Sequence, residues 1–519
     1  MTAPGILIHI DGQINHCGQG LRHRAADLTS LSLKVLACGP RLRILGTCKH
    51  RQAIAHSNAM SDSPTAKGEA RARGLSVADV LASDQHPAPA ALAEAKSAFL
   101  GDADLPANRY TCTDFFNDEV RNMWSQCWQW ACRDEHIPSV GDHYVYDIGP
   151  YSVIVARTAE SEIKAFINSC THRGTRILGE EGPGFAEGFN CPFHGWSWHL
   201  DGRLKDVPGR WDFPHVCETS HSLQRVACEA WEGFVFINLD PDAPPLKEQL
   251  DVLPEHFAHF PLADRRIRLH VQKELPANWK ASQEAFMEAY HNFTTHDSPT
   301  GANTQYDIFG PHVSRFIHNI GHYSPEALSD YPGTKWRDPV LTEQELLAGL
   351  PVEQRRLSAG ESARSVGAQL LREHMGSQLD RDFSKVSDSE MLDSIEYHLF
   401  PNAFFFPGML ISMAYRFRPL GDDVDRCLFE ILMLEPLADG ATHPDPPEPV
   451  YLTAEQSYTD IEELAWLGAV YDQDTGNLER QQQGLKTTRK GVTLGNYQET
   501  RIRRFHMTLD EYLAKHHAP

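Results

Sequence analysis

Two Cys–His pairs constrain this chain more than any other feature of its sequence. They read Cys170-Thr-His172 and Cys191-Pro-Phe-His194-Gly-Trp, and eighteen residues separate them. A Rieske [2Fe–2S] cluster requires two cysteines and two histidines, because two thiolates hold one of its irons and two imidazoles hold the other. The pairs therefore predict a Rieske [2Fe–2S] cluster bound by all four side chains.

The residues around the pairs separate a cluster from its main alternative, a structural zinc ion. Gly174 and Gly195 follow the pairs, where two hairpin tips must close around a cluster with backbone donors directed at its sulfide. Two Cys and two His can also form a tetrahedral zinc site, but zinc sites favour two cysteines separated by two to four residues. Here Cys and His alternate, and this order favours the cluster.

Length and composition limit the classes of protein to which the chain can belong. The 519 residues exceed one ordinary core, which predicts two or more domains. The chain is 41% hydrophobic and 23% charged, with no apolar run long enough to cross a bilayer, so we expect a globular protein without membrane association. Its net charge of −22 argues against a nucleic-acid partner and is compatible with a basic electron-transfer partner.

Cysteine usage indicates a reducing compartment. Two of the eleven cysteines lie in the cluster pairs, and the others form no dense paired framework. Because a cluster also needs reduced thiolates, we predict a cytoplasmic location.

The first 59 residues differ in composition from the rest of the chain. They carry seven Lys and Arg against two Asp, and three of the eleven cysteines. They lack the basic region, apolar core and cleavage site of a secretory signal. Two interpretations stay open: residues 1–59 are an N-terminal extension, or they are not native and the protein starts near Met60.

Changes of pattern predict the organisation of the remaining chain. Residues 60–107 combine an Ala-rich helical pattern with prolines, which indicates a linker with an arm helix. Aromatic residues at near-helical intervals predict a helical segment at 108–137, assigned to the second domain. Alternating apolar patterns predict an antiparallel β-domain at 138–240, with the cluster pairs in its loops. Residues 241–519 form the second domain, with a polar helical insertion at 321–392.

The second domain is expected to mix helices and strands. We predict helices at 246–260, 279–290 and 454–470, strands at 266–275, 395–406, 411–417 and 428–434, and a strand followed by a helix at 501–513. The chain has no Rossmann or Walker glycine loop, so electrons from a nicotinamide must arrive through another protein.

A second metal site is indicated by His291 and His296, five residues apart at the end of a predicted helix. Two His and one carboxylate leave coordination positions open, an arrangement that suits Fe(II) and oxygen. In a chain with 27 histidines such a pair alone is as often solvated as functional. The predicted cluster favours a functional histidine pair, because electrons that a cluster delivers one at a time need an acceptor. The carboxylate must come from elsewhere in the chain.

From about residue 105 to 515 the chain resembles the α subunit of Rieske non-haem iron ring-hydroxylating oxygenases. The resemblance rests on the two Cys–His pairs, the Asn278-Trp-Lys to His296 stretch, and the stretch from Tyr471 to Leu485. In that family an acid of the last stretch is the carboxylate ligand, and Asp474 occupies its position, with Glu479 and Gln483 at the expected offsets. The resemblance implies Fe(II) held by His291, His296 and Asp474, or by Asp472 if the register shifts.

The resemblance also implies a fold, partners and an electron route. The fold is α+β, with a small antiparallel Rieske domain and a START-like catalytic domain of helices over an antiparallel sheet. Three chains pack head to tail, and Glu288 bridges His194 of one chain and His291 of the next. NAD(P)H electrons arrive through a reductase and in some systems a ferredoxin, and a small β subunit joins some trimers.

Three positions depart from the family pattern. Most relatives have Asp where this chain has Glu288, and Glu occurs there in relatives that act on quaternary ammonium compounds. Ala285 replaces a frequent Asn, and Gln473 stands where an acid often precedes the ligand. None of these removes a ligand, but Glu288 leaves the substrate class open.

The resemblance implies an enzyme that uses O2 to hydroxylate, by mono- or dioxygenation, or to demethylate an aromatic or other hydrophobic small molecule. The alternatives are a monooxygenase of a quaternary ammonium compound and a non-catalytic Rieske electron-transfer protein. His291, His296 and Asp474 argue against the last, because a carrier needs no second iron. Pocket candidates, each of which also fits an ordinary core, are Phe286, Met287, Phe293, Phe404, Phe405, Phe406, Met409 and Met413.

Overall fold

The structure is a computed structural model that describes residues 66–258, 261–296, 304–328, 342–438, 440–441 and 444–515. The expectations for residues 1–59, and for part of the 321–392 insertion, therefore lie outside the described residues. The helices are α1 (Val77–Ser83), α2 (Ala90–Ala93), α3 (Asn108–Thr111), α4 (Thr113–Glu119), α5 (Glu218–His221), α6 (Leu246–Leu250), α7 (Leu253–His256), α8 (Trp279–Glu284), α9 (Asn292–Thr295), α10 (Pro325–Leu328), α11 (Glu343–Ala348), α12 (Ala363–Leu379), α13 (Asp388–Leu392), α14 (Trp466–Thr475), α15 (Leu478–Leu485) and α16 (Thr500–Lys515).

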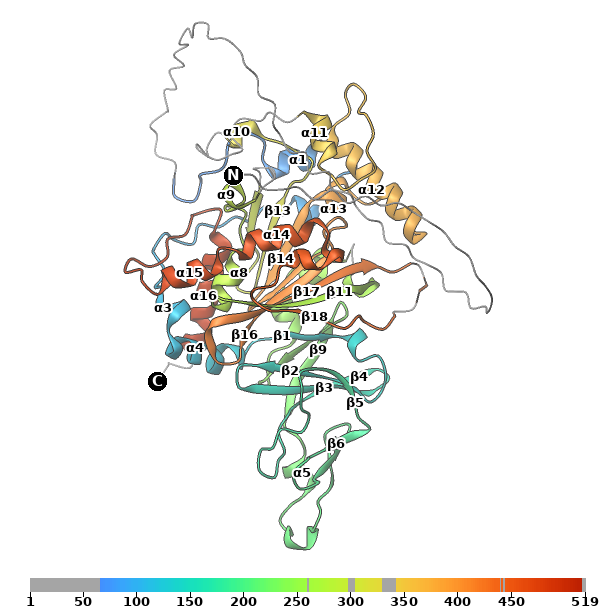
Figure 1. Cartoon of the computed structure of the whole chain (residues 1–519), viewed down its shortest axis with the longest axis vertical. Helices are drawn as coiled ribbons and strands as arrows, with labels where there is room; N and C mark the ends of the chain where they lie inside the picture. Colours follow the sequence, from blue (N-terminus) through green and yellow to red (C-terminus); the bar gives the residue numbers. More distant parts are fainter. Residues whose placement is uncertain are drawn as a thin grey trace, which may run out of the picture. The chain divides into compact units, whose positions relative to one another are not determined.

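Two antiparallel sheets occupy the first half of the described chain (Figure 1). The larger has seven strands in the order β1-β10-β9-β4-β3-β2-β5, and β6-β7-β8 form a separate small sheet. Phe166, Trp196 and Trp198 fill the core around the small sheet. The strands are β1 (Gln129–Arg133), β2 (Asp142–Ile148), β3 (Tyr151–Ala159), β4 (Glu162–Ile167), β5 (Gly182–Phe185), β6 (Gly188–Asn190), β7 (Ser197–His199), β8 (Leu204–Asp206), β9 (Arg225–Trp231) and β10 (Phe234–Asn238).

An eight-stranded sheet organises the second half, in the order β12-β13-β14-β15-β16-β17-β11-β18. Its neighbouring strands are antiparallel, except that β11 and β18 are parallel. The predicted α+β class is confirmed. The strands are β11 (Arg265–Leu275), β12 (Thr304–Ile308), β13 (Val313–His318), β14 (Ser394–Leu399), β15 (Ala403–Phe406), β16 (Met413–Leu420), β17 (Asp423–Pro436) and β18 (Val450–Leu452).

Both faces of this eight-stranded sheet are buried, and β15 shows how one run of aromatics serves both. Because successive side chains of a strand point to opposite faces, Phe404 and Phe406 join one core and Phe405 joins the other. The first core also receives side chains of α8, α14 and α16. The second receives Trp130 of β1 and side chains of α6 and α7. Helices α8, α14 and α16 thus pack on the Phe404 face of the sheet.

The predicted helix at 279–290 is shorter than expected, because α8 ends at Glu284. Polar side chains capture the backbone beyond it. The Tyr306 hydroxyl accepts the N–H of Ala289 at 3.0 Å, and the Glu288 carboxylate accepts the N–H groups of Tyr290 and His291. These bonds turn the chain into α9, and so they orient the loop that carries His291.

The helix predicted at 454–470 is also displaced. Two 3-10 turns, 458–460 and 462–464, fill the expected span, and α14 begins only at Trp466. Ser457 caps the first turn, and Ala465 has a φ of 51°, which interrupts a regular helix. Consequently Asp474 lies within a helix that packs on the sheet.

Three further segments differ from expectation. Residues 129–133, predicted to be helical, form β1, whose five residues are all buried. The 246–260 helix is divided into α6 and α7 at Asp251, which has a φ of 49°. Residues 501–513 are helical throughout, within α16. At 129–133 and 501–513 a near-helical or alternating pattern was too short to separate helix from strand.

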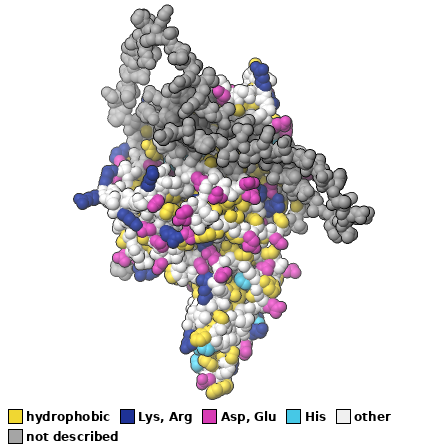
Figure 2. All heavy atoms as spheres, viewed as in Figure 1, with side chains coloured by type: hydrophobic (Ala, Val, Ile, Leu, Met, Phe, Trp, Pro, Cys, Tyr) yellow, Lys and Arg dark blue, Asp and Glu magenta, His cyan; other side chains and the backbone are white. Residues whose placement is uncertain are grey.

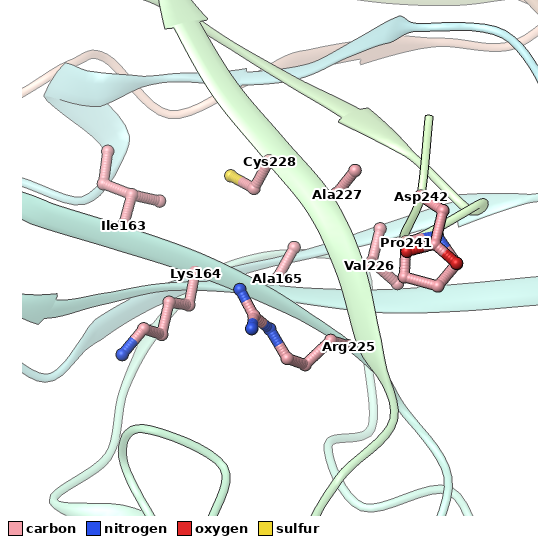
Figure 3. A pocket seen from close by; sticks show the side chains of 9 residues that line it. All are labelled: Ile163, Lys164, Ala165, Arg225, Val226, Ala227, Cys228, Pro241 and Asp242. Atoms are coloured by element: carbon pink, nitrogen blue, oxygen red, sulfur yellow. The ribbon is translucent and has the colours of Figure 1, made fainter. Parts of the chain in front are cut away.

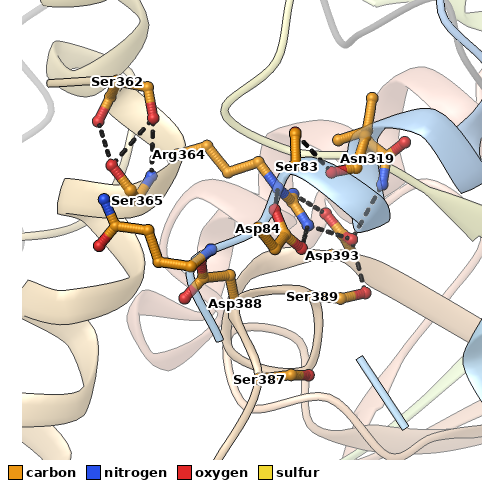
Figure 4. Close-up of polar contacts among 12 residues, drawn as sticks. Ser83, Asp84, Asn319, Ser362, Arg364, Ser365, Ser387, Asp388, Ser389 and Asp393 are labelled. Carbon is orange, nitrogen blue, oxygen red and sulfur yellow. Dashed lines mark hydrogen bonds and ion pairs between the residues drawn. The ribbon is translucent and has the colours of Figure 1, made fainter. Parts of the chain in front are cut away.

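A buried ion-pair cluster fastens the arm helix α1 to the helices of the insertion (Figure 4). The Arg364 guanidinium on α12 donates to Asp84 at 2.6 and 2.8 Å and to Asp393 at 2.6 and 3.0 Å. Asp393 also accepts hydrogen bonds from Asn319 and Ser389. Removing one partner of such a buried group leaves uncompensated charge.

Replacing Arg364 by methionine is therefore expected to lower the unfolding free energy by about 3–5 kcal/mol. Two buried carboxylates would lose their shared cation. Urea denaturation at neutral pH measures the change. Arg355→Met is the control, since its pair with Glu361 is 40% and 34% exposed and contributes about 1 kcal/mol or less. Equal effects of the two substitutions would show that the buried ion-pair cluster around Arg364 does not stabilise the fold.

On the surface seen in Figure 2, acidic side chains are interspersed with Lys and Arg. This distribution suits a chain with a net charge of −22. Among the described residues, no helix is both long and apolar enough to cross a membrane.

Candidate metal centres

The two Cys–His pairs lie in matched loops, one after β4 and one between β6 and β7. In each loop the glycine four residues after the cysteine donates its N–H to that cysteine's carbonyl, at 2.8 Å for Gly174 and 3.1 Å for Gly195. Both glycines have positive φ, 78° and 74°, which other residues rarely adopt. The loops bring the His172 and His194 rings to 4.8 Å between centroids.

The surroundings of the four side chains fit a [2Fe–2S] cluster. Cys170 and Cys191 are buried. Burial and the neighbouring Cys191 raise the pKa of the Cys170 thiol. Burial also raises the pKa of Cys191, but the backbone N–H groups of Phe193 and His194 and the neighbouring Cys170 outweigh it, so the pKa of Cys191 is lowered. His172 stacks on Trp196, with 4.9 Å between ring centroids and planes 3° apart. Backbone donors directed at sulfur stabilise thiolates, as a cluster requires.

A second group of possible metal ligands lies beyond the C-terminal end of α8 and on α14. His291, His296 and Asp474 each offer one atom, and these atoms lie within 4.8 Å of one another. The Asp474 Oδ1 atom lies 3.1 Å from Nε2 of each histidine. Residues 183 positions apart in the chain thus form one cluster, as the family resemblance implies.

Hydrogen bonds on the opposite ring nitrogens orient both histidines. His291 donates its Nδ1–H to Glu288 Oε1 at 2.7 Å, and His296 donates its Nδ1–H to Gln473 Oε1 at 2.9 Å. These bonds direct both Nε2 lone pairs at Asp474. Metal-binding histidines are held in this way. Gln473 was noted in the sequence only as a departure from the family pattern, and its position next to Asp474 is the signal for this role.

Two lone pairs directed at one carboxylate require a positive charge between them. Burial lowers the pKa of His291, but its hydrogen bonds to Asp474 and Glu288 outweigh it and raise that pKa to about 10. Burial raises the pKa of Asp474, and the two imidazoles overcome this and lower it. A proton thus takes the place of a cation, and the donor set fits a divalent iron.

The alternative ligand Asp472 does not join this cluster. Its carboxylate accepts hydrogen bonds from the Ser457 hydroxyl and from the Tyr458 N–H at 3.0 Å. Glu479 and Gln483, which match the family offsets, form a hydrogen bond with each other on the exposed face of α15 at 3.2 Å. On the helix α14, Asp472 and Asp474 therefore have different environments.

The pocket candidates are packed against one another. The Phe286 ring lies 5.1–5.6 Å from the rings of Phe417, Phe429 and Tyr415, and Phe404 lies 4.7 Å from Tyr415. Met287, Phe406 and Met413 belong to the same core, Met409 lies in the core of the insertion, and Phe293 is buried on α9. Phe405 faces the opposite side of the sheet, so its expected place in the pocket is wrong.

A separate pocket of about 220 Å³ opens beside β4 and β9 (Figure 3). Lys164 and Arg225 lie near each other at its edge, and Cys228 lies on β9. None of the candidate metal ligands lines this pocket.

Comparison with known families agrees with both sites. A model of the Rieske [2Fe-2S] domain matches residues 127–216, and a model of the ring-hydroxylating α subunit catalytic domain matches residues 262–515. The chain belongs to the Rieske ring-hydroxylating oxygenase family. Its two matched domains imply a Rieske [2Fe–2S] cluster and a mononuclear iron used with O2.

Similar proteins are oxygenase subunits. The chain is 29% identical over 189 residues to the carnitine monooxygenase oxygenase subunit of Escherichia coli K12, covering 36% of this chain and 50% of that protein. It is 32% identical over 196 residues to the large component of naphthalene 1,2-dioxygenase of Pseudomonas putida, covering 36% and 42%. The chain thus spans half or less of the length of the curated relatives that it matches.

Solved structures share the fold. A quaternary ammonium Rieske monooxygenase in complex with L-carnitine superposes with a TM-score of 0.55 at 18% identity, covering 80% of this chain and 96% of that chain. Naphthalene 1,2-dioxygenase with indole bound gives a TM-score of 0.55 at 17% identity, covering 80% and 94%.

Proposed function

We propose that this chain is the terminal component of an oxygenase that hydroxylates or oxidatively demethylates a small organic molecule. One observation carries the proposal: two oriented imidazoles and a carboxylate converge in a chain that also holds matched Cys–His loops. An electron carrier would need only the loops. An iron held by His291, His296 and Asp474 supplies oxygen activation.

Each candidate site residue has a defined role in this proposal. His291, His296 and Asp474 hold the iron, and Glu288 and Gln473 hold the two imidazoles in position. Cys170, His172, Cys191 and His194 hold the cluster. The aromatic core around Phe286 and Phe404 keeps water from the buried side of the site. Mono- and dioxygenation are both compatible with this arrangement.

Electrons are proposed to come from NAD(P)H through a separate reductase, with or without a ferredoxin. They would pass from the cluster through His194 of one chain to Glu288 and His291 of the next, within a homotrimer that a β subunit can join. Phe193, beside His194, is 59% exposed, and Tyr290, beside His291, is 50% exposed. Exposed aromatics next to both sites support a contact between copies.

Mixed trimers test this route. Cys191→Ser removes a cluster ligand and Asp474→Ala removes an iron ligand, so each variant alone is expected to be inactive. Co-expression of the two variants with different tags gives trimers that contain both chains, without unfolding and reassembly. Purified mixed trimers are expected to regain turnover, because a complete cluster faces a complete iron site at some interfaces. Inactive mixed trimers that retain both metals would exclude transfer between chains.

The substrate is proposed to be an aromatic or other hydrophobic molecule, because the candidate pocket side chains are aromatic or thioether groups. A quaternary ammonium compound is the second candidate. It is favoured by Glu288 at the position that bridges the two metal sites, and by the similarity to a carnitine monooxygenase subunit.

Electron paramagnetic resonance of the anaerobic Fe(II) protein with nitric oxide tests the function and needs no reductase. We expect a high-spin iron–nitrosyl signal that one class of compound sharpens, among aromatic acids, polycyclic compounds and quaternary amines. That class would identify the substrate. A reduced Rieske signal without an iron–nitrosyl signal in an iron-replete sample would favour the non-catalytic electron-transfer alternative.

A further inference from the structure

The peptide groups on both sides of Glu288 are held by side chains from other parts of the fold. The Arg501 guanidinium of α16 donates to the Met287 carbonyl at 3.0 Å, and the Tyr306 hydroxyl of β12 accepts the N–H of Ala289 at 3.0 Å. Both of these side chains are buried. The two contacts lie one residue before and one residue after Glu288, so they hold its backbone from both directions.

The Arg501 guanidinium is itself held by two strands of the eight-stranded sheet. Its Nε–H donates to the Ser314 hydroxyl of β13 at 3.1 Å, and an Nη2–H donates to Glu396 Oε1 of β14 at 2.7 Å. Glu396 is buried, and its other oxygen accepts the Tyr415 hydroxyl at 2.8 Å. A guanidinium presents its donors in a rigid planar fork. The sheet therefore determines the direction of the third bond, to Met287.

The position of Glu288 in turn determines the orientation of His291. The Glu288 carboxylate accepts the His291 Nδ1–H at 2.7 Å and the backbone N–H of the same residue at 3.1 Å. With Nδ1 held in this way, Nε2 of the ring is directed at Asp474, 3.1 Å away. A displacement of the peptides around Glu288 would therefore move its carboxylate and turn the imidazole.

We propose that Arg501 and Tyr306 are positioning residues, which hold the peptides before and after Glu288 and thereby orient the His291 imidazole toward the iron site. A glutamate has one more rotatable bond than an aspartate, so a fixed backbone is needed to keep its carboxylate in one place. The value of this positioning for electron transfer rests on the proposed function. The positioning itself is a property of the chain without metals.

Amide hydrogen exchange of the metal-free protein tests the positioning without turnover. The N–H groups of residues 289–291 are bonded to side chains in the wild-type protein. Arg501→Lys keeps a positive charge beside Glu396, but an ammonium does not reproduce the planar fork. Loss of the bond to the Met287 carbonyl is expected to speed exchange of these N–H groups by about 10-fold. Unchanged exchange would overturn the inference.

Arg315 of β13 is the matched control for Arg501. Its guanidinium is also buried and donates to a buried carboxylate, that of Asp307, at 2.7 Å. Its backbone acceptors, however, are the carbonyls of Ala91 and Glu94 in the arm, each at 2.7 Å. Arg315→Lys should therefore speed exchange in the arm and leave the metal loop unchanged. Equal effects of both lysine substitutions on the metal loop would indicate a general loss of stability and contradict the inference.

Tyr306→Phe removes only the hydroxyl that accepts the Ala289 N–H, and it serves as the main test if Arg501→Lys does not fold. A buried N–H left without an acceptor opens more easily, so its exchange is expected to rise by about 10-fold. Tyr397→Phe is the control, because this buried hydroxyl contacts Arg315 at 3.1 Å instead. Equal exchange of the Ala289 N–H in the two tyrosine variants would contradict the role of Tyr306.

The same variants with both metals bound test what the positioning serves. Neither Arg501→Lys nor Tyr306→Phe alters a candidate metal ligand, so both proteins should keep the cluster and the iron. A less uniformly oriented His291 ring should broaden the iron–nitrosyl signal. Re-oxidation of the reduced cluster with O2 and substrate should slow by about 10-fold, because small displacements of a reacting group are costly. Arg315→Lys should change neither measurement.

Two outcomes keep this inference separate from the proposed function. If exchange of the metal loop rises in Arg501→Lys and Tyr306→Phe while the iron–nitrosyl signal and the re-oxidation rate stay as in the wild type, the two residues do not orient His291, and the inference is wrong. If the wild-type protein forms no iron–nitrosyl, the proposed function fails, and amide exchange alone decides whether Arg501 and Tyr306 position Glu288.

Discussion

Replacing Asp474 by alanine is expected to remove the mononuclear iron and leave the [2Fe–2S] cluster in place. Asp474 is the carboxylate on which both Nε2 atoms converge at 3.1 Å. Two imidazoles without a carboxylate hold Fe(II) weakly. Iron should fall from about three to about two atoms per chain, and hydroxylation to background. Metal analysis with the visible spectrum of the cluster measures both.

Asp472→Ala is the matched control, because this acid lies two residues away on the same helix. Its carboxylate is bound to Ser457 and the Tyr458 N–H, away from the histidines. The substitution should keep the iron and cost about 1 kcal/mol of stability, as the loss of a capping group does. Iron loss in Asp472→Ala but not in Asp474→Ala would show that the assignment of the carboxylate ligand is wrong.

Replacing Glu288 by glutamine is expected to keep both metals and slow the transfer between them by about 100-fold. The amide preserves the size of the side chain but loses the charge that accepts the His291 Nδ1–H at 2.7 Å. Stopped-flow re-oxidation of the reduced cluster in the presence of O2 and substrate measures the step. Glu288→Asp keeps the charge with a shorter reach and should retain more of the rate.

The metal content of the Glu288→Gln protein determines how its re-oxidation rate is interpreted. A Glu288→Gln protein that loses its mononuclear iron would show that Glu288 mainly positions His291. A protein with full metal content and wild-type re-oxidation would exclude Glu288 from the route. Only slow re-oxidation with full metal content supports a bridge between sites.

The candidate metal ligands could be predicted from the sequence, because metal binding of this kind needs rare residue types at short spacing. Cys170 and His172, or Cys191 and His194, are close in the chain, and their loops close locally through Gly174 and Gly195. Asp474 required the family resemblance, since nothing local marks one acid of α14 as a ligand. Phe405 was placed in the pocket wrongly because its neighbours are also phenylalanines, so the sequence does not show which of them faces which side of the sheet. Side chains of β15 alternate between the two faces, and Phe405 lies on the face opposite Phe404 and Phe406.

Helix boundaries were less accessible, because side chains far along the chain decide them. α8 stops where Tyr306 and Glu288 capture backbone N–H groups, and α14 starts after the positive φ of Ala465. Similarly, β1 is a strand because its five residues are buried within a sheet completed by β10, about a hundred residues later. Local propensity carries no information on these partners.

By itself the sequence predicted the cluster, the α+β class and the two candidate histidines of the second metal site, because ligand chemistry and short spacing are local properties. Only the tertiary structure decided which acid faces the histidines and that Gln473 orients His296. These contacts join residues that are 177 to 183 positions apart. Burial and hydrogen bonding between such residues are set when the helices pack on the sheet, and so they appear in no local pattern.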